Sequence, residues 1–445
     1  MKNESFPGLA ILYQSVDSLT PYTNNARTHS TRQIRQIANS IRSFGFTNPI
    51  LVTGNGRIAA GQGRLEAAKL LGMELVPTIR LEGLTDDQIR AYMLTDNRLA
   101  EKAGWDNSIL AIELQHLTTV HSNFDVTITG FDVPEIDVII EEVRTKLDDK
   151  DDLFQFNEAA QPVTQYGDLW QLGKHRIMCG NSLDESSFKL LMARRQANVA
   201  FVDPPYNVVI DGHATGNGQI HHKAFAMASG EMNEVEYATF LNTSLRLLAR
   251  HSTPTAISFA CIDWRHLADL VAAGRQIFDS VLNICVWVKN NAGMGSFYRS
   301  QHEFICVFRN GRGHHRNNVQ LGKFGRNRTN VWQYPGVNAL SRQGEEGNLL
   351  ALHPTVKPVT LVADALLDAS ARGEIVLDSF LGSGTTLIAA ERVGRICFGI
   401  EIDPIYVDVG IRRWQKHTGD DAIHAATGKA FNAMAVEAGV KGGRE

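Results

Sequence analysis

The chain has 445 residues, a formal net charge of −4 at pH 7 and 43% hydrophobic residues. This length predicts two or three domains rather than one core, and the composition is that of a soluble globular protein. The sequence holds no apolar run that approaches the roughly 20 residues needed to cross a bilayer. Its start, MKNESFPGLAILYQ, lacks the build of a secretory signal, and its five cysteines stand in apolar surroundings. We therefore expect a cytoplasmic protein with reduced core thiols rather than disulfides or a zinc site.

The first zone, from about residue 11 to 105, alternates short apolar runs with helical patterns, which predicts a small α/β or α+β domain. Two of its segments are Asn24-Asn25-Ala26-Arg27 and Ala60-Gly61-Gln62-Gly63-Arg64-Leu65-Glu66-Ala67-Ala68. With these segments the zone resembles the N-terminal domain of the ParB family, and we assign residues 1–110 to such a domain.

The ParB resemblance implies a nucleotide site formed by Gly61, Gly63 and Arg64, in which backbone amides at a helix start hold phosphates and the arginine adds charge. Asp96-Asn97-Arg98 is similar to part of a later motif of that family, but no arginine follows two places on, which argues against nucleotide hydrolysis. The alternative is a fused DNA-contacting or dimerising module that has no nucleotide site. Both interpretations stay open from the sequence.

The second zone is acidic. The stretch from Phe131 to Glu158 carries charges at helical spacing and ends in DDKDD. This pattern favours a solvated helical linker, which we place at residues 111–160. A catalytic domain at 161–430 and a C-terminal tail at 431–445 would then complete the chain.

In the third zone, strand signals alternate with longer helical segments. The strands are expected at 198–203, 255–260, 282–289, 302–308, 373–378 and 395–401. This alternation predicts an α/β fold with a doubly wound, mainly parallel sheet that helices cover on both faces. Two of the strands end in aspartates. Asp203 stands before Pro204-Pro205, and Asp378 stands before a glycine-rich turn. Ligands of open α/β sheets bind at the carboxyl ends of strands, so these two loops are where we expect the chemistry.

The turn after Asp378 contains Gly382 and Gly384 and leads into a helix and a second strand that ends at Glu401. A nucleoside-triphosphate loop would need a lysine after the last glycine, and a dinucleotide loop a third glycine where Leu387 stands. The remaining candidate is S-adenosylmethionine, whose ribose hydroxyls would donate to Glu401. A tight turn of purely structural value remains the alternative.

The segment FVDPPYN places Asp203, Pro204, Pro205 and Tyr206 at the end of a buried strand. Two prolines make a rigid, extended spur. The carboxylate of Asp203 and the carbonyl of Pro204 could accept the two N–H groups of an exocyclic amine and so favour its nucleophilic form. Tyr206 would stack on a base flipped out of the duplex. We expect neither a nucleophilic side chain nor a metal in this reaction.

With these motifs and with His353-Pro354-Thr355-Val356-Lys357-Pro358 between them, residues 166–420 resemble the DNA amino-methyltransferases that make N6-methyladenine or N4-methylcytosine. The predicted catalytic tetrad, Asp203–Tyr206, comes before the predicted cofactor loop, Asp378–Thr386. This order is similar to that of the permuted β group of the family. The resemblance implies a target-recognition region at about 311–350 and the cofactor S-adenosylmethionine. It implies cofactor-binding residues at Asn181, Ser182, Asp378, Phe380, Gly382, Gly384, Thr385, Glu401 and Lys357.

The stretch from Gly311 to Thr329 contains basic residues and no acidic one. Its cations are Arg312, Arg316, Lys323, Arg326 and Arg328. We predict that they contact DNA phosphates, although an exposed basic loop that binds nothing has the same sequence. The segment from Asn207 to Glu231 resembles a mobile loop that closes on substrate, and its pair His221-His222 is read as loop histidines rather than metal ligands.

Together these features predict a methyltransferase that acts on N6 of adenine in double-stranded DNA. The adenine preference follows from the resemblance, because family members that act on cytosine more often carry Ser in place of Asp203. The open alternatives are N4 of cytosine, an RNA or protein amide as acceptor, and a ParB-like DNA-binding protein with a vestigial methylase domain. A homodimer is also left open.

Overall fold

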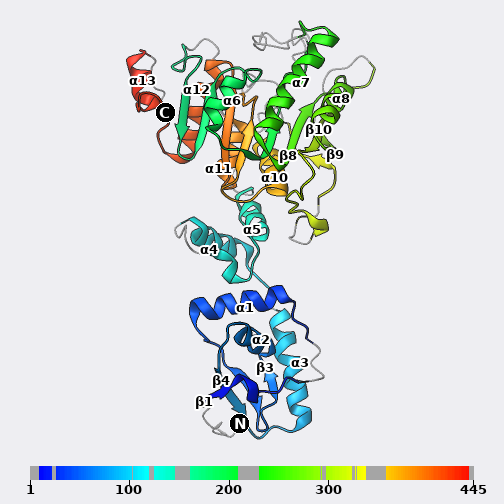
Figure 1. Ribbon diagram of the computed structural model, residues 1–445, viewed down its shortest axis with the longest axis vertical. Coiled ribbons are helices and arrows are strands. Elements are labelled where there is room, and N and C mark those ends of the chain that lie inside the picture. The colour runs from blue at the N-terminus through cyan, green and yellow to red at the C-terminus, as the bar shows by residue number, and fades with distance from the viewer. Residues whose placement is uncertain are drawn as a thin grey trace. The chain divides into compact units, whose positions relative to one another are not determined.

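The computed structural model describes residues 10–22, 27–102, 104–119, 125–145, 161–208, 230–290, 292, 297–322, 326, 328–336 and 357–439. The chain divides into two compact units, Met1–Val143 and Arg144–Glu445 (Figure 1). In the part of the chain covered by these ranges, no helix has the length and apolar character needed to span a bilayer.

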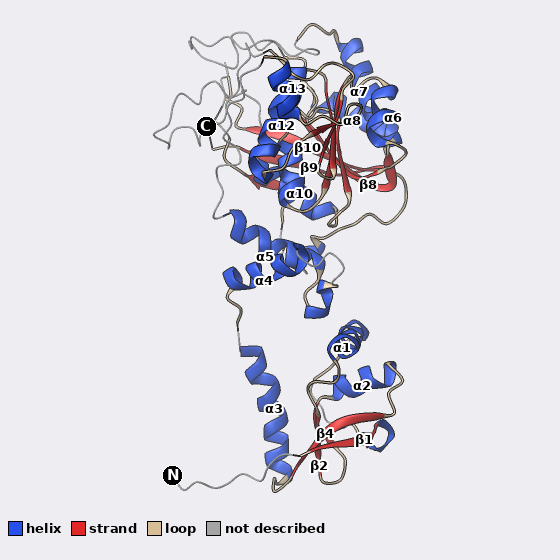
Figure 2. Cartoon of the chain, turned by 90° about the vertical axis from the view of Figure 1, so that its left-hand side faces the viewer, coloured by secondary structure: helices blue, strands red, loops and turns tan. Residues whose placement is uncertain are grey.

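The first unit is built on a four-stranded sheet in the order β1-β4-β2-β3 (Figure 2). Its strands are β1 (Ile11–Ser15), β2 (Ile50–Thr53), β3 (Ile58–Ala60) and β4 (Leu75–Leu81), and its helices are α1 (Thr31–Phe44), α2 (Gln62–Leu70) and α3 (Asp86–Lys102). The core joins Ile50, Leu65 and Val76, which are fully buried. This small α+β domain agrees with the sequence prediction.

Two further helices of this unit, α4 (Asn107–Thr119) and α5 (Val133–Thr145), correct the predicted linker. Leu114 of α4 packs with Ile136 and Ile140 of α5 in a core of their own. The two isoleucines lie four positions apart and therefore share one face of the helix. The acidic residues Glu135, Asp137, Glu141 and Glu142 thus belong to a helix that also buries an apolar face, whereas residues 146–160, with the DDKDD run, lie outside the described residues.

The second unit contains a ten-stranded sheet in the order β11-β9-β10-β8-β7-β12-β13-β6-β5-β14. The strands are β5 (Leu169–Leu172), β6 (His175–Cys179), β7 (Ala197–Val202), β8 (Ser252–Ile262), β9 (Ser280–Val288), β10 (His302–Arg309), β11 (Val331–Gln333), β12 (Ile375–Asp378), β13 (Ile396–Glu401) and β14 (Ile423–His424). All six predicted strands are present, and β5, β6, β11 and β14 are additional. The centre is parallel as predicted, whereas β10 runs antiparallel to both of its neighbours and β5 to both of its own.

Helices cover both faces of this sheet. They are α6 (Glu185–Met192), α7 (Glu234–Arg250), α8 (Leu267–Ile277), α10 (Val359–Ala369), α11 (Thr385–Arg392), α12 (Pro404–Thr418) and α13 (Phe431–Glu437). Alternate residues of β7 enter different cores: Phe201 packs on the side of α10, α11 and α12, and Ala200 on the side of α6, α7 and α8. The fold class predicted from the sequence is confirmed.

The end of the chain differs from the predicted tail. Phe431, the first residue of α13, is fully buried and stacks edge-on against Trp170 of β5, with ring centroids 5.3 Å apart. Residues up to Glu437 therefore belong to the folded domain. The apolar residues 431 and 435 lie one helical turn apart, a spacing that indicates a packed helix. The prediction of a C-terminal tail did not take this spacing into account.

Candidate active site

Four neighbouring parallel strands bring the predicted site segments to one edge of the sheet. They lie in the order β7, β12, β13 and β6. Because all four run in the same direction, the residues at their carboxyl ends gather at that edge. Asp203 follows β7, Asp378 ends β12, Glu401 ends β13 and Asn181 comes two residues after β6. The tetrad and the predicted cofactor loop, which we call the cofactor turn (residues 378–386), thus face the same space. Asp203 and Asp378 are 175 residues apart in the chain.

The cofactor turn depends on two glycines in the left-handed region. Gly382 has φ 53° and Gly384, the N-cap of α11, has φ 86°. A β-carbon at Gly384 would approach the backbone of Gly410 in α12 to 3.0 Å, so the turn and α12 can pack this closely only with glycine. The first residue of α11, Thr385, is buried at this helix start.

Two carboxylates hold this turn. One oxygen of Glu401 accepts from the Gly382 amide at 2.8 Å and the other from the Asp403 amide at 2.9 Å. Asp378 accepts from the Phe380 amide at 2.9 Å. Burial raises the pKa of Asp378 and of Glu401 to about 7 in each case. A hydrogen-bond donor such as a ribose hydroxyl would favour the ionised form of each carboxyl and so lower its pKa.

The remaining predicted cofactor residues surround this turn. The side chain of Asn181 accepts from the Leu183 amide at 2.9 Å, and Ser182 is buried beside it. The ring of Phe380 lies 5.8 Å from that of Phe240 in α7. Among the described residues, the hydroxyl of Ser379 is buried without a hydrogen-bond partner. With the carboxylates of Asp378 and Glu401, this hydroxyl gives the turn polar groups that fit a nucleoside.

The tetrad is rigid and well anchored. The Tyr206 hydroxyl donates to Asp203 Oδ1 at 2.6 Å, and the carbonyl of Pro205 accepts from the Tyr237 hydroxyl at 3.1 Å. Pro204 is buried between them. Asn207 adopts φ 53° and its amide contacts the backbone of Met232 at 2.7 Å, which fastens the spur to the start of α7. Burial raises the pKa of Asp203, and the nearby Lys357 opposes that effect.

Lys357 lies elsewhere than predicted. We expected it among the cofactor residues, but its ammonium forms an ion pair with Asp203 Oδ2 and lies 3.2 Å from the Tyr206 hydroxyl. Its side chain is only 4% exposed. Burial alone would favour the neutral amine, yet the carboxylates of Asp203 and Glu303 raise the pKa of Lys357 above its ordinary value. Lys357 therefore lies against Asp203 and Tyr206, and its ammonium stays charged.

Two residues of this cluster were not predicted from the sequence. Glu303, near the start of β10, lies 3.0 Å from the Lys357 ammonium and also pairs with Lys289, just after β9. Burial works against its charge, but Lys357 and Lys289 lower the pKa of Glu303 to about 2. A charged residue inside the otherwise apolar strand HEFICVF was the signal that could have found it.

The predicted DNA-contacting arginines separate into two groups. Arg312 is exposed (94% for its side chain) and pairs with Asp279 at 3.3 Å, and the half-exposed Arg316 pairs with Glu374 at 3.0 Å. Both remain at the surface, where phosphates can reach them. Lys323 lies outside the described residues.

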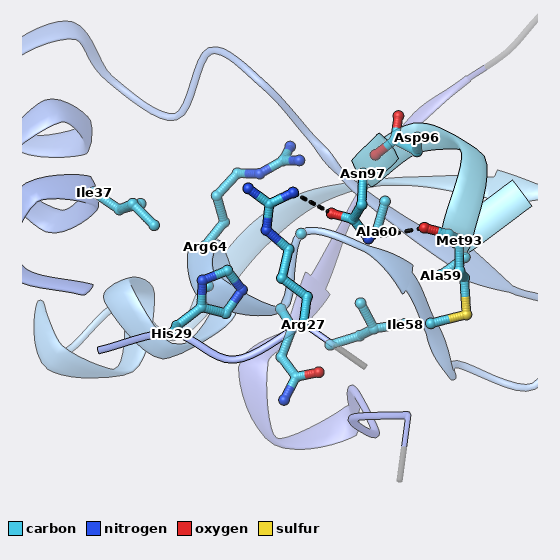
Figure 3. Close-up of a pocket in the computed structure, with 13 residues that line it drawn as sticks. Arg27, His29, Ile37, Ile58, Ala59, Ala60, Arg64, Met93, Asp96 and Asn97 are labelled. Carbon is cyan, nitrogen blue, oxygen red and sulfur yellow. Dashed lines mark hydrogen bonds between the residues drawn. The ribbon is translucent and has the colours of Figure 1, made fainter. Parts of the chain in front are cut away.

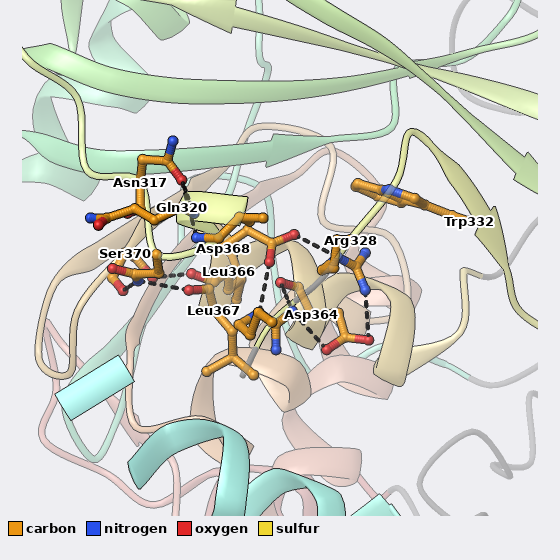
Figure 4. Close-up of polar contacts among 12 residues, drawn as sticks. Asn317, Gln320, Arg328, Trp332, Asp364, Leu366, Leu367, Asp368 and Ser370 are labelled. Carbon is orange, nitrogen blue, oxygen red and sulfur yellow. Dashed lines mark hydrogen bonds and ion pairs between the residues drawn. The ribbon is translucent and has the colours of Figure 1, made fainter. Parts of the chain in front are cut away.

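Arg326 and Arg328, in contrast, turn inward onto α10. Figure 4 shows Arg328 with Asp364 and Asp368. The Arg326 guanidinium is 7% exposed and bonds Asp368 at 2.8 Å and Asp364 at 3.0 Å. Arg328 pairs with the same two aspartates and covers the ring of Trp332 in β11 at 4.9 Å. This geometry differs from the predicted phosphate-contacting role, because buried guanidiniums that are already paired have no surface to offer DNA. They anchor the segment before β11 to α10.

The first unit holds the predicted nucleotide residues around a pocket of about 210 Å³ (Figure 3). Gly61, with φ 99°, is the N-cap of α2, and Gly63 is buried in its first turn. Arg64 donates to the carbonyl oxygens of Asn48 at 2.6 Å and Pro49 at 2.7 Å. Arg64 therefore lines the pocket while backbone carbonyls hold its guanidinium.

Two further segments whose motifs resemble the ParB family, one with Arg27 and one with Asp96 and Asn97, also line that pocket. Arg27 donates to the side chain of Asn97 at 2.7 Å, and Asn97 in turn donates to the carbonyl of Met93 at 2.8 Å. Asp96 also lines the pocket. Two segments 70 residues apart, which carry the motifs noted in the sequence, thus meet at one site.

Several predicted features lie outside the described residues. These are residues 209–229 with His221 and His222, residues 24–26, and residues 337–356, which contain most of the segment His353–Pro358 and the end of the target-recognition region. The predictions made for them stay predictions.

Comparison with protein-family models confirms both resemblances. A DNA methylase model matches residues 197–412, and a ParB N-terminal domain model matches residues 6–98. A ParB-methyltransferase HTH domain model matches residues 108–166, which agrees with the packing of α4 and α5 and not with a linker.

Individual proteins are similar to each part of the chain. The ParB-like nuclease domain-containing protein YnaK of Escherichia coli K12 is 52% identical over 80 residues, which are 18% of this chain and 92% of YnaK. The Type II methyltransferase M2.LlaDCHI of Lactococcus lactis subsp. cremoris is 25% identical over 244 residues, 52% of this chain and 87% of that protein. Among solved structures, the PvuII DNA methyltransferase, which is cytosine-N4-specific, has a TM-score of 0.42 at 14% identity and covers 63% of this chain and 94% of its own.

Proposed function

The chain belongs to the DNA methylase family whose members modify N6 of adenine or N4 of cytosine, joined to ParB-like N-terminal domains, and on that premise we propose that it methylates N6 of adenine in duplex DNA. The observation that supports this proposal is the position of Asp203 and Tyr206 beside the carboxylates Asp378 and Glu401, at the ends of adjacent strands. An acceptor for an amine and a nucleoside site share one edge of the sheet.

S-adenosylmethionine, when bound, supplies a methyl group on a sulfonium. The side chain of Glu401 would hold its ribose hydroxyls, and Asp378, Asn181 and the glycine turn would enclose the rest of the nucleoside. The residues Ser182, Phe380, Gly382, Gly384 and Thr385 line the same turn and complete the proposed cofactor site. The buried Ser379 hydroxyl would gain a partner on binding.

The tetrad activates the amine. An exocyclic amine is a weak nucleophile because its lone pair is delocalised into the ring. The Asp203 carboxylate, which has spare lone pairs beside those used by Tyr206 and Lys357, accepts one N–H, and the Pro204 carbonyl accepts the other. Tyr206 offers its ring face to the base, which must leave the helix to reach this pocket. The reaction then needs alignment rather than a covalent intermediate.

Adenine is favoured over cytosine because Asp stands at position 203, where family members that act on cytosine more often carry Ser. The test is methyl transfer from radiolabelled S-adenosylmethionine to unmethylated genomic DNA, followed by digestion to nucleosides. We expect label in N6-methyl-2′-deoxyadenosine, its loss in Asp203→Ala, and no change in Asp420→Ala, an exposed aspartate. Label in N4-methylcytosine would overturn the adenine assignment, and label in RNA or protein alone would overturn the DNA substrate.

A second activity is proposed for the first unit, namely nucleotide binding at the pocket between α2 and α3. It is supported by the left-handed Gly61 at the start of α2 and by the cationic lining from Arg27 and Arg64. The test is equilibrium binding of each labelled ribonucleoside triphosphate to the full chain. Saturable binding that Arg27→Ala weakens at least tenfold supports it, and equal binding by both proteins contradicts it.

A further inference from the structure

The catalytic tetrad is surrounded by a balanced cluster of charges from separate parts of the fold. Asp203 follows β7, Lys289 follows β9, Glu303 lies in β10 and Lys357 precedes α10. Two carboxylates thus face two ammonium groups. The side chains of Glu303 and Lys357 are only 10% and 4% exposed, so water does little to screen these two charges, whereas Asp203 and Lys289 are partly exposed at 24% and 27%. Buried ions persist only when they are paired in this way.

Glu303 is the common anchor of the two groups that hold Asp203. Tyr206 bonds one oxygen of Asp203, and Lys357 bonds the other. Both groups also reach the same oxygen of Glu303, the Tyr206 hydroxyl at 3.1 Å and the Lys357 ammonium at 3.0 Å. The second oxygen of Glu303 is occupied by Lys289.

We propose that Glu303 is a positioning residue for methyl transfer, which acts through Lys357 and Tyr206 on the carboxylate of Asp203. This inference rests on the proposed function. With Glu303 present, Lys357 is held between two carboxylates, which fixes the position of its ammonium and of the Asp203 carboxylate that would receive the target amine. Without that charge, the Lys357 ammonium has Asp203 as its one remaining carboxylate partner in the cluster, and the Tyr206 hydroxyl, whose single proton goes to Asp203 at 2.6 Å, loses the second carboxylate oxygen that faces it at 3.1 Å.

An effect of Glu303 on the target amine can be distinguished from an effect on packing or on cofactor binding. Glu303 lies on the amine side of the site, whereas the carboxylates of the cofactor turn lie on β12 and β13. A change at Glu303 should therefore affect turnover rather than cofactor affinity. Misplacement of an acceptor by about 1 Å can cost on the order of 100-fold in rate.

The test compares Glu303→Gln with the wild-type full chain in the methyl-transfer assay. The amide has the same shape but no charge. We expect kcat to fall on the order of 10- to 100-fold, while the KM and the calorimetric Kd for S-adenosylmethionine change less than twofold. Glu303→Asp restores the charge one methylene further away and should recover part of the lost kcat.

A matched control is Glu391→Gln. Glu391 is also a partly buried glutamate of the second unit, and it bonds His175 at 2.7 Å and Trp414 at 2.9 Å. This control should lower the melting temperature and leave kcat unchanged. If Glu303→Gln cannot be purified folded, Tyr206→Phe serves instead, because it keeps the ring and removes the hydroxyl that links Asp203 to Glu303; a lowered kcat is expected.

The inference is overturned if folded Glu303→Gln keeps kcat within twofold of wild type. It is also overturned if Glu303→Asp gives no recovery, or, where Tyr206→Phe must be used, if that variant turns over at the wild-type rate. A wild-type chain that binds cofactor and methylates no nucleic acid would instead overturn the proposed function, so the two failures are distinguishable.

Discussion

Lys357 and Asp203, 154 residues apart in the chain, form a buried ion pair at the carboxyl end of β7. The pair joins the proposed catalytic tetrad to the residue that lies two positions before α10. Lys357 thereby determines how much negative charge Asp203 can present. Removal of Lys357 leaves the Asp203 carboxylate without its counter-ion, whereas removal of Asp203 leaves Lys357 paired with Glu303.

Lys357→Met is expected to lower kcat and to move the acid limb of the pH profile upward. Burial already raises the pKa of Asp203, and removal of Lys357, which lowers it, raises it further. Asp203 would then become protonated, and inactive as an acceptor, at a higher pH. The measurement is kcat against pH from 5 to 9, with the exposed Lys416→Met as control. An acid limb at the wild-type pH would contradict this assignment.

Cofactor binding should weaken as the pH falls through 7. The pKa values of Asp378 and Glu401 are raised to about 7 by burial, so the carboxylate forms decline below that pH. If one ionised carboxylate is required, affinity at pH 6 should be about tenfold lower than at pH 8. Calorimetric titration of wild type and Glu401→Gln checks this: the variant should bind more weakly and show a flatter pH dependence.

The same two groups influence stability with the opposite sign. Their pKa values are higher in the folded chain without cofactor than in the unfolded chain, so the folded state binds more protons. The stability they contribute is fully present below their ordinary pKa values near 4 and is lost as the pH rises through about 7. Thermal melts at pH 5 and pH 8 should show a larger drop for wild type than for the doubly substituted Asp378→Asn, Glu401→Gln chain.

Arg326→Met should destabilise the second unit without weakening its binding to DNA. Arg326 is buried against Asp364 and Asp368, and removal of one partner from a buried ion pair costs about 3–5 kcal/mol. Denaturant unfolding would report this destabilisation. DNA affinity, measured per folded molecule, should stay within twofold of wild type; a large decrease would restore the phosphate-contacting role first predicted from the sequence.

Arg312 and Arg316 should behave in the converse way. Both side chains are exposed enough to reach phosphates, so the double variant Arg312→Ala, Arg316→Ala is expected to weaken DNA binding and leave the melting temperature unchanged. The slope of log affinity against log salt should fall by about 1 for each phosphate that the variant no longer neutralises. The exposed Arg246→Ala provides the control, and an unchanged slope in the double variant would count against this surface as a DNA-binding site.

The local features of this protein could be read directly from its sequence. The strands around 198–203 and 373–378, the rigid Asp-Pro-Pro-Tyr spur and the glycine turn each depend on neighbours within about ten residues. Propensity and periodicity act over that distance, so these elements appear where they were predicted. The ParB-like domain was identified for the same reason, through two short motifs.

The tertiary structure decided which of these pieces meet. Strand order places β12 and β13 between β7 and β6, and no local pattern encodes a pairing of segments nearly 200 residues apart. For that reason Lys357 was expected beside the cofactor and lies on Asp203, and Glu303 was not expected at all. Burial of a charge depends on partners from distant segments, such as Asp368 for Arg326, and those partners are brought together only when the chain folds.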